Sequence, residues 1–530
     1  MRKNKFLLTA LATLGLLASS CEDAYNITQP GEVNDPDVVY TSIDNLEYGL
    51  NGVYAVFSTA SEIEFTSIFT DETSIGIQNG GQGLISGLYN FNLNSGSDAP
   101  QAIWQSNYLL INFANRLMVA AEKFKTDNPY YWEVNPDDTQ DVLDEKLDVT
   151  SRYDNVIAQL YGLRAYAYMD LVSWFSTDPA DDSALGVMLL DFVPADDYST
   201  FLPRVTNGEI YALIDSDIQK ALDIYSTSAS PILTSTYYVS EDFLYALKLR
   251  ELVYRKKYQD AVTLFASNEI PMGTSPYPLQ NTLDGYISQL GDVTAEESIF
   301  KIACVTGDFQ VGSYWNSSSS TVDGAPFFEI SRSLYNAYGS SDIRMQPDAI
   351  IDSSSLIMSA AQLAIASNGT YRNNDILVVN KYPGNEAQGD RLLNDLKVFT
   401  IGELVLLRAE ALAGIGNLNG TATTSAAYWV RRLRNYRTGI NTAVTFADQT
   451  DAFSVIQDER RKELAFMGMR YLDIKRLGPV TGKGVDRYSL DCAPYGSCTL
   501  SATDYRFTMP IPNTEIIANP SIQGQQNPGY

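Results

Sequence analysis

Apolar side chains recur every three or four residues along much of this chain, and this spacing restricts the fold more than any other feature. In residues 42–60 the spacing is kept by Ile43, Leu46, Leu50, Val53 and Val56. Residues three or four apart lie on one face of an α-helix, so the stretch predicts a helix with one buried face. The same spacing predicts helices within residues 101–124, 153–175, 207–225, 241–267, 399–417 and 425–439.

Two of these stretches are similar to tetratricopeptide repeats, in which two antiparallel helices pack together. Residues 241–267 predict two helices that meet near residues 254–257, and the second helix carries Tyr258, Ala261 and Phe265. That spacing is typical of the second helix of such a repeat, where the small residue lets the partner helix approach. Residues 399–439 predict one more pair. We expect a mostly α fold with about four degenerate helical pairs; an irregular helical domain without repeats is the alternative.

Two segments interrupt the helical pattern. Residues 62–100 are rich in Gly, Asn and Ser, and residues 268–396 begin with Pro- and Gly-rich sequence and include a short strand candidate at 298–305. Loops held on a rigid scaffold often carry binding residues. We therefore expect one domain over residues 41–530, made of a helical scaffold at 41–267 and 397–530 and a loop-rich lobe with short strands at 268–396.

The first 20 residues have the composition of an export signal. Arg2, Lys3 and Lys5 precede an apolar run over residues 6–18, which is too short to span a membrane. Small residues then lead to Cys21, and this sequence resembles the lipobox of bacterial lipoproteins. The resemblance implies a signal peptide at 1–20 and a lipid anchor with palmitate as an acyl chain on Cys21. An ordinary secretory signal cut after Ser20 is the alternative.

The residues after Cys21 suggest how an anchored chain would be displayed. Glu22 and Asp23 resemble an acidic export signal found behind the lipidated cysteine of surface lipoproteins. Residues 21–40 are polar and contain proline, so we interpret them as a tether. The expected location is the outer membrane, with the protein facing the cell exterior.

Histidine is absent from all 530 residues, and this excludes Ser-His-Asp, Cys-His and His-ligated zinc chemistry within the chain. A net charge of −27 at pH 7 also disfavours nucleic acid as a partner. Hydrolysis by two carboxylates remains open, with Asp137 beside Asp138 and Asp181 beside Asp182. These pairs lie among Asn, Pro, Ser and Thr, which favours exposed loops, so we expect a non-catalytic protein.

The remaining cysteines and one acidic stretch raise separate questions. Cys492 and Cys498 enclose a short turn-rich loop and are candidates for a local disulfide, with two free thiols as an equal alternative. Cys304 is expected to be a buried free thiol. Residues 135–148 are acidic and could bind calcium, but they lack the EF-hand pattern. The sequence therefore predicts no particular metal.

The most specific motifs lie near the C-terminus. Residues 456–478, IQDERRKELAFMGMRYLDIKRLG, resemble the ERR-x-EL helix of the SusD/RagB family, and residues 509–530, MPIPNTEIIANPSIQGQQNPGY, resemble its terminal signature. LYGLRAYAYMDLVSWF and LPRVTNGEIYALI resemble its Arg-Ala helix and its Pro-Arg segment. The resemblance covers nearly the whole chain after the signal and implies a SusD-like fold. Met467 departs from the glutamate usual in the family.

The ERR-x-EL stretch also supports a structural interpretation. Asp458 and Lys462 are four residues apart and are expected to pair along one helix face. The side chains expected to face the core are Ile456, Leu464 and Phe466. Asn527, Pro528 and Gly529 predict a tight terminal turn, because Pro fixes its φ and Gly permits a positive one.

The family resemblance implies a non-catalytic surface lipoprotein that caps a SusC-like TonB-dependent barrel and captures oligosaccharide or peptide for import. Other surface lipoproteins are further implied partners. The alternative is a structural subunit of a multi-protein outer-membrane complex without a nutrient ligand, and a carboxylate hydrolase is a third class. No cofactor beyond the lipid on Cys21 is implied.

Sugar binding needs flat aromatic faces together with amide or carboxylate groups, and both Gly- and Asn-rich segments contain them. The candidate ligand-binding residues are Tyr89, Phe91, Asn92, Tyr314, Trp315, Asn316, Phe327 and Phe328. Each aromatic has an alternative role as a plug over the core. Trp104, Trp174 and Trp429 lie in helical stripes and are expected in the core.

Overall fold

The computed structural model describes most of the chain after its N-terminal segment. The described residues are 39–76, 87–194, 200–228, 235–267, 270, 276–294, 297–316, 326–385 and 389–530. The expected signal peptide, the lipidation site Cys21 and the export signal at Glu22 and Asp23 lie outside these residues.

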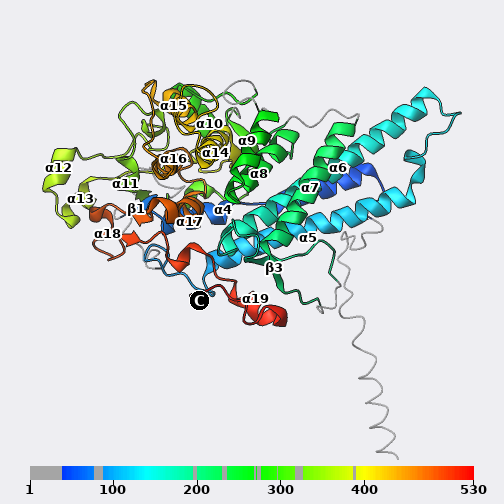
Figure 1. Ribbon diagram of the computed structural model, residues 1–530, viewed down its shortest axis with the longest axis horizontal. Coiled ribbons are helices and arrows are strands. Elements are labelled where there is room, and N and C mark those ends of the chain that lie inside the picture. Colours follow the sequence, from blue (N-terminus) through cyan, green and yellow to red (C-terminus); the bar gives the residue numbers. More distant parts are fainter. Residues whose placement is uncertain are drawn as a thin grey trace, which may run out of the picture.

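Long helices form one end of the molecule. The helix α6 (Gln140–Phe175) packs against both α5 (Asp98–Asp127) and α7 (Asn207–Thr227), and α3 (Ile43–Ala55) lies against α5 and α6. Figure 1 shows the connected ends of α5 and α6 reaching farthest to the right. The apolar spacing predicted these four helices correctly, although α6 begins well before residue 153.

The Arg-Ala motif has a clear structural role among these helices. The Arg164 side chain on α6 is only 5% exposed and donates to Asp217 on α7 at 2.7 Å and to Asn115 on α5 at 2.7 Å. One guanidinium therefore joins all three long helices. Charge-assisted bonds of this kind are stronger than neutral ones, because one partner or both are ionised.

The tetratricopeptide-like pairs also form as predicted. The helices α8 (Glu241–Tyr254) and α9 (Tyr258–Ser267) pack together, as do α14 (Ile401–Gly414) and α15 (Ala426–Thr438), and α9 packs on α14. A Cβ atom on Gly414 would lie 2.1 Å from the Tyr258 ring. The close approach of α9 and α14 therefore needs a glycine on α14 as well as the buried Ala261 on α9.

The loop-rich lobe is closed at its base by a pair of strands. Strand β4 (Ser298–Ile302) runs antiparallel to β8 (Leu396–Thr400), with Ser298 opposite Thr400 and Ile302 opposite Leu396. The chain therefore leaves and re-enters the helical scaffold at neighbouring points. Strand β1 (Thr73–Ile75) pairs with β5 (Phe328–Ile330) and ties the other Gly-rich segment to the lobe.

The remaining described elements lie in the scaffold, in the lobe and in the C-terminal region. They are α4 (Ala60–Phe69), η1 (Pro129–Tyr131), β2 (Leu185–Met188), β3 (Arg204–Thr206), α10 (Leu283–Leu290), η2 (Val311–Tyr314), α11 (Arg332–Tyr335), η4 (Ile343–Met345), α12 (Ala360–Ile365), α13 (Asn368–Asn374), β6 (Gly384–Asn385), β7 (Asp390–Arg391), α16 (Gln449–Glu463), α17 (Arg470–Thr481), β9 (Val485–Asp486), α18 (Ser489–Cys492), β10 (Thr499–Leu500), η6 (Tyr505–Phe507), α19 (Asn513–Ala518) and η7 (Pro520–Ile522). Within the described part of the chain, no helix is long and apolar enough to cross a membrane.

A network of buried ion pairs is centred on α16. The fully buried Arg344 of η4 donates to Glu459 at 2.9 Å and to Glu463 at 2.8 Å. Arg437 of α15, also fully buried, binds Glu463 and reaches Glu297 at 2.7 Å. The two glutamates of α16 therefore join the last helical pair to the start of β4 and to the middle of the lobe.

The central arginine of the ERR sequence extends this network into the scaffold. Arg460 donates to Asp473 of α17 at 2.7 Å and lies 3.7 Å from Glu403 of α14, which also pairs with Arg250 of α8 at 2.6 Å. The expected pair of Asp458 with Lys462 is wrong. Asp458 pairs with Lys483, whereas Lys462 pairs with Glu459 one helical turn away, because the buried carboxylate attracts the nearby ammonium.

The core-facing side of this helix is as expected. The three side chains predicted to face inward are all at most 2% exposed: Ile456, Leu464 and Phe466. The predicted terminal turn is also present, since the Tyr530 amide donates to the Asn527 carbonyl and Gly529 has a φ of 97°.

The terminal motif packs against the Pro-Arg motif. The Asn527 side chain donates to the carbonyls of Phe175 and Met509, each at 2.7 Å. Arg204 donates to the Gln525 carbonyl at 2.6 Å and to the Asn527 side chain at 3.0 Å. Two motifs more than 300 residues apart in the sequence therefore complete one buried hydrogen-bond cluster.

Glu463→Gln should lower the free energy of unfolding by about 3 kcal/mol, because it removes the carboxylate that the buried Arg344 and Arg437 share and leaves each arginine with fewer compensating partners, Glu459 and Glu297 among them. Burial alone would raise the pKa of Glu463, but the two arginines outweigh it and lower the pKa to about 2. Its stabilisation is thus present above the unfolded pKa of about 4.3 and is lost as the pH falls towards 2. Urea unfolding at pH 7 and pH 3 measures both effects.

Asp458→Asn is the matched control on the same helix. Its side chain is 54% exposed and pairs only with a partly exposed lysine, so the expected loss is below about 1 kcal/mol. Equal losses in the two variants would contradict the role given to the buried network.

Candidate functional site

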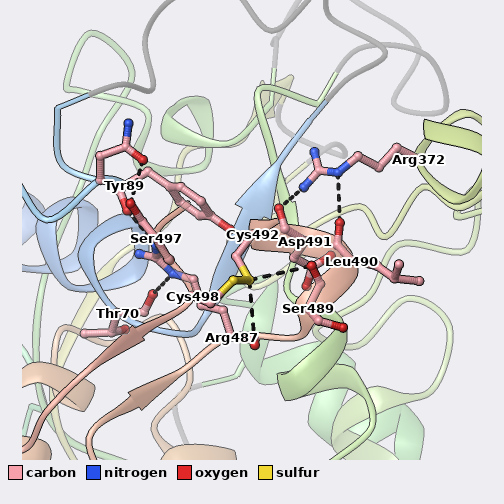
Figure 2. Close-up of a disulfide and its surroundings, with 11 residues drawn as sticks. Thr70, Tyr89, Arg372, Arg487, Ser489, Leu490, Asp491, Cys492, Ser497 and Cys498 are labelled. Carbon is pink, nitrogen blue, oxygen red and sulfur yellow. Dashed lines mark hydrogen bonds between the residues drawn. A yellow bond between two sulfur atoms is a disulfide. The ribbon is translucent and has the colours of Figure 1, made fainter. Parts of the chain in front are cut away.

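The candidate ligand-binding residues at 89–92 lie near a disulfide. Cys492 and Cys498 form this bond, which closes the loop that carries Tyr495 (Figure 2). Arg487 lies beside the loop and donates to the backbone carbonyls of Thr70 and Ser497 at 2.9 Å each. Its guanidinium also binds the carbonyls of Ile68 and Phe69, each at 3.0 Å. The loop and the end of α4 are therefore fastened to one buried cation.

The candidate residues at 89–92 pack around the same arginine. The Arg487 guanidinium lies 3.7 Å from the centre of the Tyr89 ring and 4.4 Å from that of Phe91. Tyr89 and Phe91 are at most 5% exposed, so neither presents a ring face to solvent. Among these three candidates only Asn92 is exposed. This cluster supports packing rather than stacking on a ligand.

Most of the second candidate group is also buried. Trp315 is fully buried, stacks on Tyr382 at 5.8 Å and donates to the Ser67 hydroxyl at 3.1 Å. Asn316 donates to the Val379 carbonyl at 2.8 Å, and Phe328 is a buried residue of β5. These three side chains hold the lobe together and have no free surface for a ligand. Phe327 is half-buried.

An exposed aromatic pair remains on this part of the lobe. The Phe309 side chain is 53% exposed, and its ring centre lies 4.7 Å from that of the half-buried Tyr314. The candidate residues predicted from the sequence include Tyr314 but not Phe309, although Phe309 is an aromatic residue of the same Gly-containing segment.

The backbone around Tyr314 fixes the position of its ring. Tyr314 ends η2, and the preceding Gly312 packs so closely that a Cβ atom would lie 2.7 Å from the Tyr382 carbonyl oxygen. The Gly312 amide donates to the Leu392 carbonyl at 3.1 Å. Only glycine fits this contact, so η2 is seated firmly on the lobe and η2 also contacts α4.

Carboxyl groups of α4 lie near the aromatic pair. Burial raises the pKa of Tyr314, and the negative charges of Glu64 and Glu62 on α4, which contacts η2, raise it further. Burial also raises the pKa of Glu64 to about 7, with an added contribution from the negative charge of Asp98. Glu64 is half-buried and Asp98 is exposed.

The other acidic candidates have structural partners. Asp138 pairs with Lys146 at 2.7 Å, and Asp182 pairs with Arg255 at 2.8 Å. Among the residues that the structure describes, including 135–148, no group of three or more acidic or cysteine side chains could hold a metal ion. The half-buried Cys304 forms no disulfide, and burial raises the pKa of its thiol to about 12.

Phe309, Tyr314 and Glu64 therefore form the candidate site. The Phe309 and Tyr314 rings can stack on the apolar face of a pyranose. The Glu64 carboxyl can accept hydrogen bonds from sugar hydroxyls or, when protonated, donate one to them.

Comparisons with known proteins agree with the fold. Residues 312–530 match the model of the SusD family. The chain is 23% identical to SusD-like protein P2 of Formosa agariphila, and the alignment covers 99% of this chain and 100% of that protein. A SusD superfamily protein from Bacteroides thetaiotaomicron has a similar structure, with a TM-score of 0.68 and 21% identity over 92% of this chain and 100% of that one. A laminarin-binding SusD-like protein gives a TM-score of 0.62 and 19% identity, covering 93% of this chain and 100% of that one.

Glu64 should titrate near pH 7, and Asp98→Asn should lower that midpoint because it removes a nearby negative charge. The folded-state pKa exceeds the unfolded value of about 4.3, so this group stabilises the fold below pH 4.3 and loses that effect as the pH rises towards 7. NMR of 13C-labelled glutamate carboxyls measures the midpoint. A Glu64 midpoint near 4.3 would contradict the burial inferred here.

Proposed function

Because residues 312–530 match the SusD family model and the whole chain is similar to a SusD-like protein, we propose that it is a SusD/RagB-family, non-catalytic surface lipoprotein that captures a neutral saccharide for import through a SusC-like TonB-dependent barrel. The saccharide stacks on Phe309 and Tyr314, and Glu64 contacts its hydroxyls. The observation that carries this proposal is the exposed Phe309 ring, whose centre lies 4.7 Å from that of the half-buried Tyr314, on a part of the lobe that contacts the helix of the half-buried Glu64.

Two further observations support a saccharide as the ligand. A similar solved structure is described as a laminarin-binding SusD-like protein. The net charge of −27 disfavours an anionic ligand, whereas a neutral sugar meets no electrostatic penalty. Glu64, with its pKa near 7, can offer a hydroxyl as well as an acceptor oxygen at neutral pH.

The proposed attachment depends on the N-terminal segment. Cys21 carries the lipid, Glu22 and Asp23 direct surface display, and the following residues act as a tether of the body to the membrane. Each buried methylene of an acyl chain contributes about 0.8 kcal/mol of anchoring. In this arrangement the body caps the barrel and can move relative to it.

Replacing both rings, Phe309→Ala with Tyr314→Ala, should weaken binding to neutral polysaccharide at least about tenfold, which corresponds to about 1.4 kcal/mol. Affinity electrophoresis in gels that contain laminarin, amylopectin, xylan or galactomannan finds the ligand, and isothermal titration measures the dissociation constant. Glu64→Gln should weaken binding less, because the amide keeps one acceptor and gains donors.

Tyr48→Ala is the control, since this tyrosine is 72% exposed on α3 and lies outside the site. It should bind as tightly as the wild type. Unchanged affinity in the double variant would refute the proposed site. Binding of peptides by a wild-type protein that ignores every polysaccharide would refute the proposed ligand class.

Cys21→Ala should remove the covalent lipid, so the protein should no longer be displayed on the surface and should be released or retained in the membrane with its signal uncut. Surface proteolysis of intact cells, followed by fractionation, measures the location, and mass spectrometry measures the lipid. Cys304→Ala is the matched cysteine control and should be displayed normally. Normal display of the Cys21 variant would contradict the proposed anchor.

A further inference from the structure

A cluster of aromatic side chains occupies the turn between α5 and α6, at the end of the molecule farthest to the right in Figure 1. Tyr130 and Tyr131 belong to η1, and Trp132 follows directly. The centres of the two tyrosine rings lie 5.3 Å apart in an edge-to-face arrangement. This cluster, which we call the tip platform, contains none of the residues of the proposed saccharide site on the lobe.

Tyr130 is held from beneath by a buried charge. The Lys146 ammonium lies 4.4 Å from the centre of the Tyr130 ring and is bound by the Glu133 carbonyl at 2.6 Å and by Asp138 at 2.7 Å. The lysine is only 3% exposed, yet the tyrosine above it is 45% exposed. A buried charge is costly unless it is paired, so Glu133 and Asp138 hold the Lys146 ammonium in place. The ammonium in turn contacts one face of the Tyr130 ring, while the rest of the ring stays accessible to solvent.

The Trp132 ring is likewise held by neighbouring side chains. Its ring meets Tyr153 edge to face at 5.1 Å and Phe124 at 6.2 Å, and the Lys125 ammonium lies 5.6 Å from its centre. The side chain nevertheless stays partly exposed. The other four tryptophans, all within the described residues, are at most 3% exposed: Trp104, Trp174, Trp315 and Trp429.

If these aromatic side chains served only to pack the turn between α5 and α6, their rings would be buried. Instead the rings are held by neighbouring side chains and still expose part of their surface to solvent. The turn that follows Trp132 carries the exposed polar side chains of Glu133, Asn135 and Asp137, together with the exposed apolar Val134. Carboxylate and amide groups next to a fixed aromatic face match the hydroxyls and the apolar face of a sugar. The same acidic groups oppose an anionic membrane surface.

We propose that the tip platform is a second binding site for neutral saccharides, in which a pyranose stacks on Tyr130 and its hydroxyls bond to the acidic and amide groups around it. The inference rests on the proposed function only for the class of ligand. It places two contacts for one polysaccharide on separate parts of the molecule. Two linked contacts raise the avidity for a long chain without raising the affinity for a short one.

Trp132 provides a direct test, because it is the partly exposed tryptophan and acrylamide should quench it most. In the full-length protein, laminarin, amylopectin, xylan or galactomannan should protect Trp132 fluorescence from acrylamide. Tyr130→Ala should reduce the protection at least fivefold, Tyr130→Phe should keep it, and the control Tyr48→Ala should not change it. Circular dichroism checks that Tyr130→Ala is folded.

The two sites can be separated in the same assay. The Phe309→Ala and Tyr314→Ala double variant should keep the fluorescence protection even if binding at the lobe is lost, so failure of one site leaves the other visible. Absence of protection by all four polysaccharides in the wild type, or equal protection in Tyr130→Ala, would overturn the tip platform. Protection by phosphatidylethanolamine–phosphatidylglycerol vesicles alone would also overturn it and would assign the cluster to a membrane.

Discussion

The buried carboxylates of α16 are the constraint on which the rest of the structure depends. Glu459 and Glu463 are at most 5% exposed and accept hydrogen bonds from arginines of η4 and α15. Each buried charge would be costly alone, so the cluster forms only when the last helical pair, the base of the lobe and α16 are all in place. These ion pairs thereby fix the positions of the helices and of the long loops relative to one another.

The same principle appears at each joint of the molecule. Arg164 joins three long helices, Arg204 joins the Pro-Arg segment to the chain terminus, and Arg487 fastens the disulfide loop to the end of α4. Each guanidinium binds several oxygens from separate segments, which suits its fixed, forked set of donors. Loops can therefore be long without being loosely placed, and a ring at a loop surface can be restrained well enough to bind a ligand.

Aromatic composition alone did not separate packing from binding. Trp315 and Tyr89 occur in the same kind of Gly- and Asn-rich sequence as Phe309, yet Trp315 is buried on Tyr382 and Tyr89 is buried under Arg487. Their partners lie far away in the sequence, so no local pattern could indicate that they are covered. Phe309 stays exposed in the same kind of sequence, and only the folded chain shows this.

By itself the sequence determined the long helices with one buried face, because apolar spacing is a local property, but it missed α4, which is buried on nearly all sides. It also determined the family motifs, the strand near residue 300 and the absence of histidine chemistry. Tertiary structure alone decided which charges pair, as Lys462 shows by choosing the buried Glu459 over Asp458. It also decided which aromatic rings face solvent. Burial depends on contacts between distant segments, and these contacts exist only once the whole chain has folded.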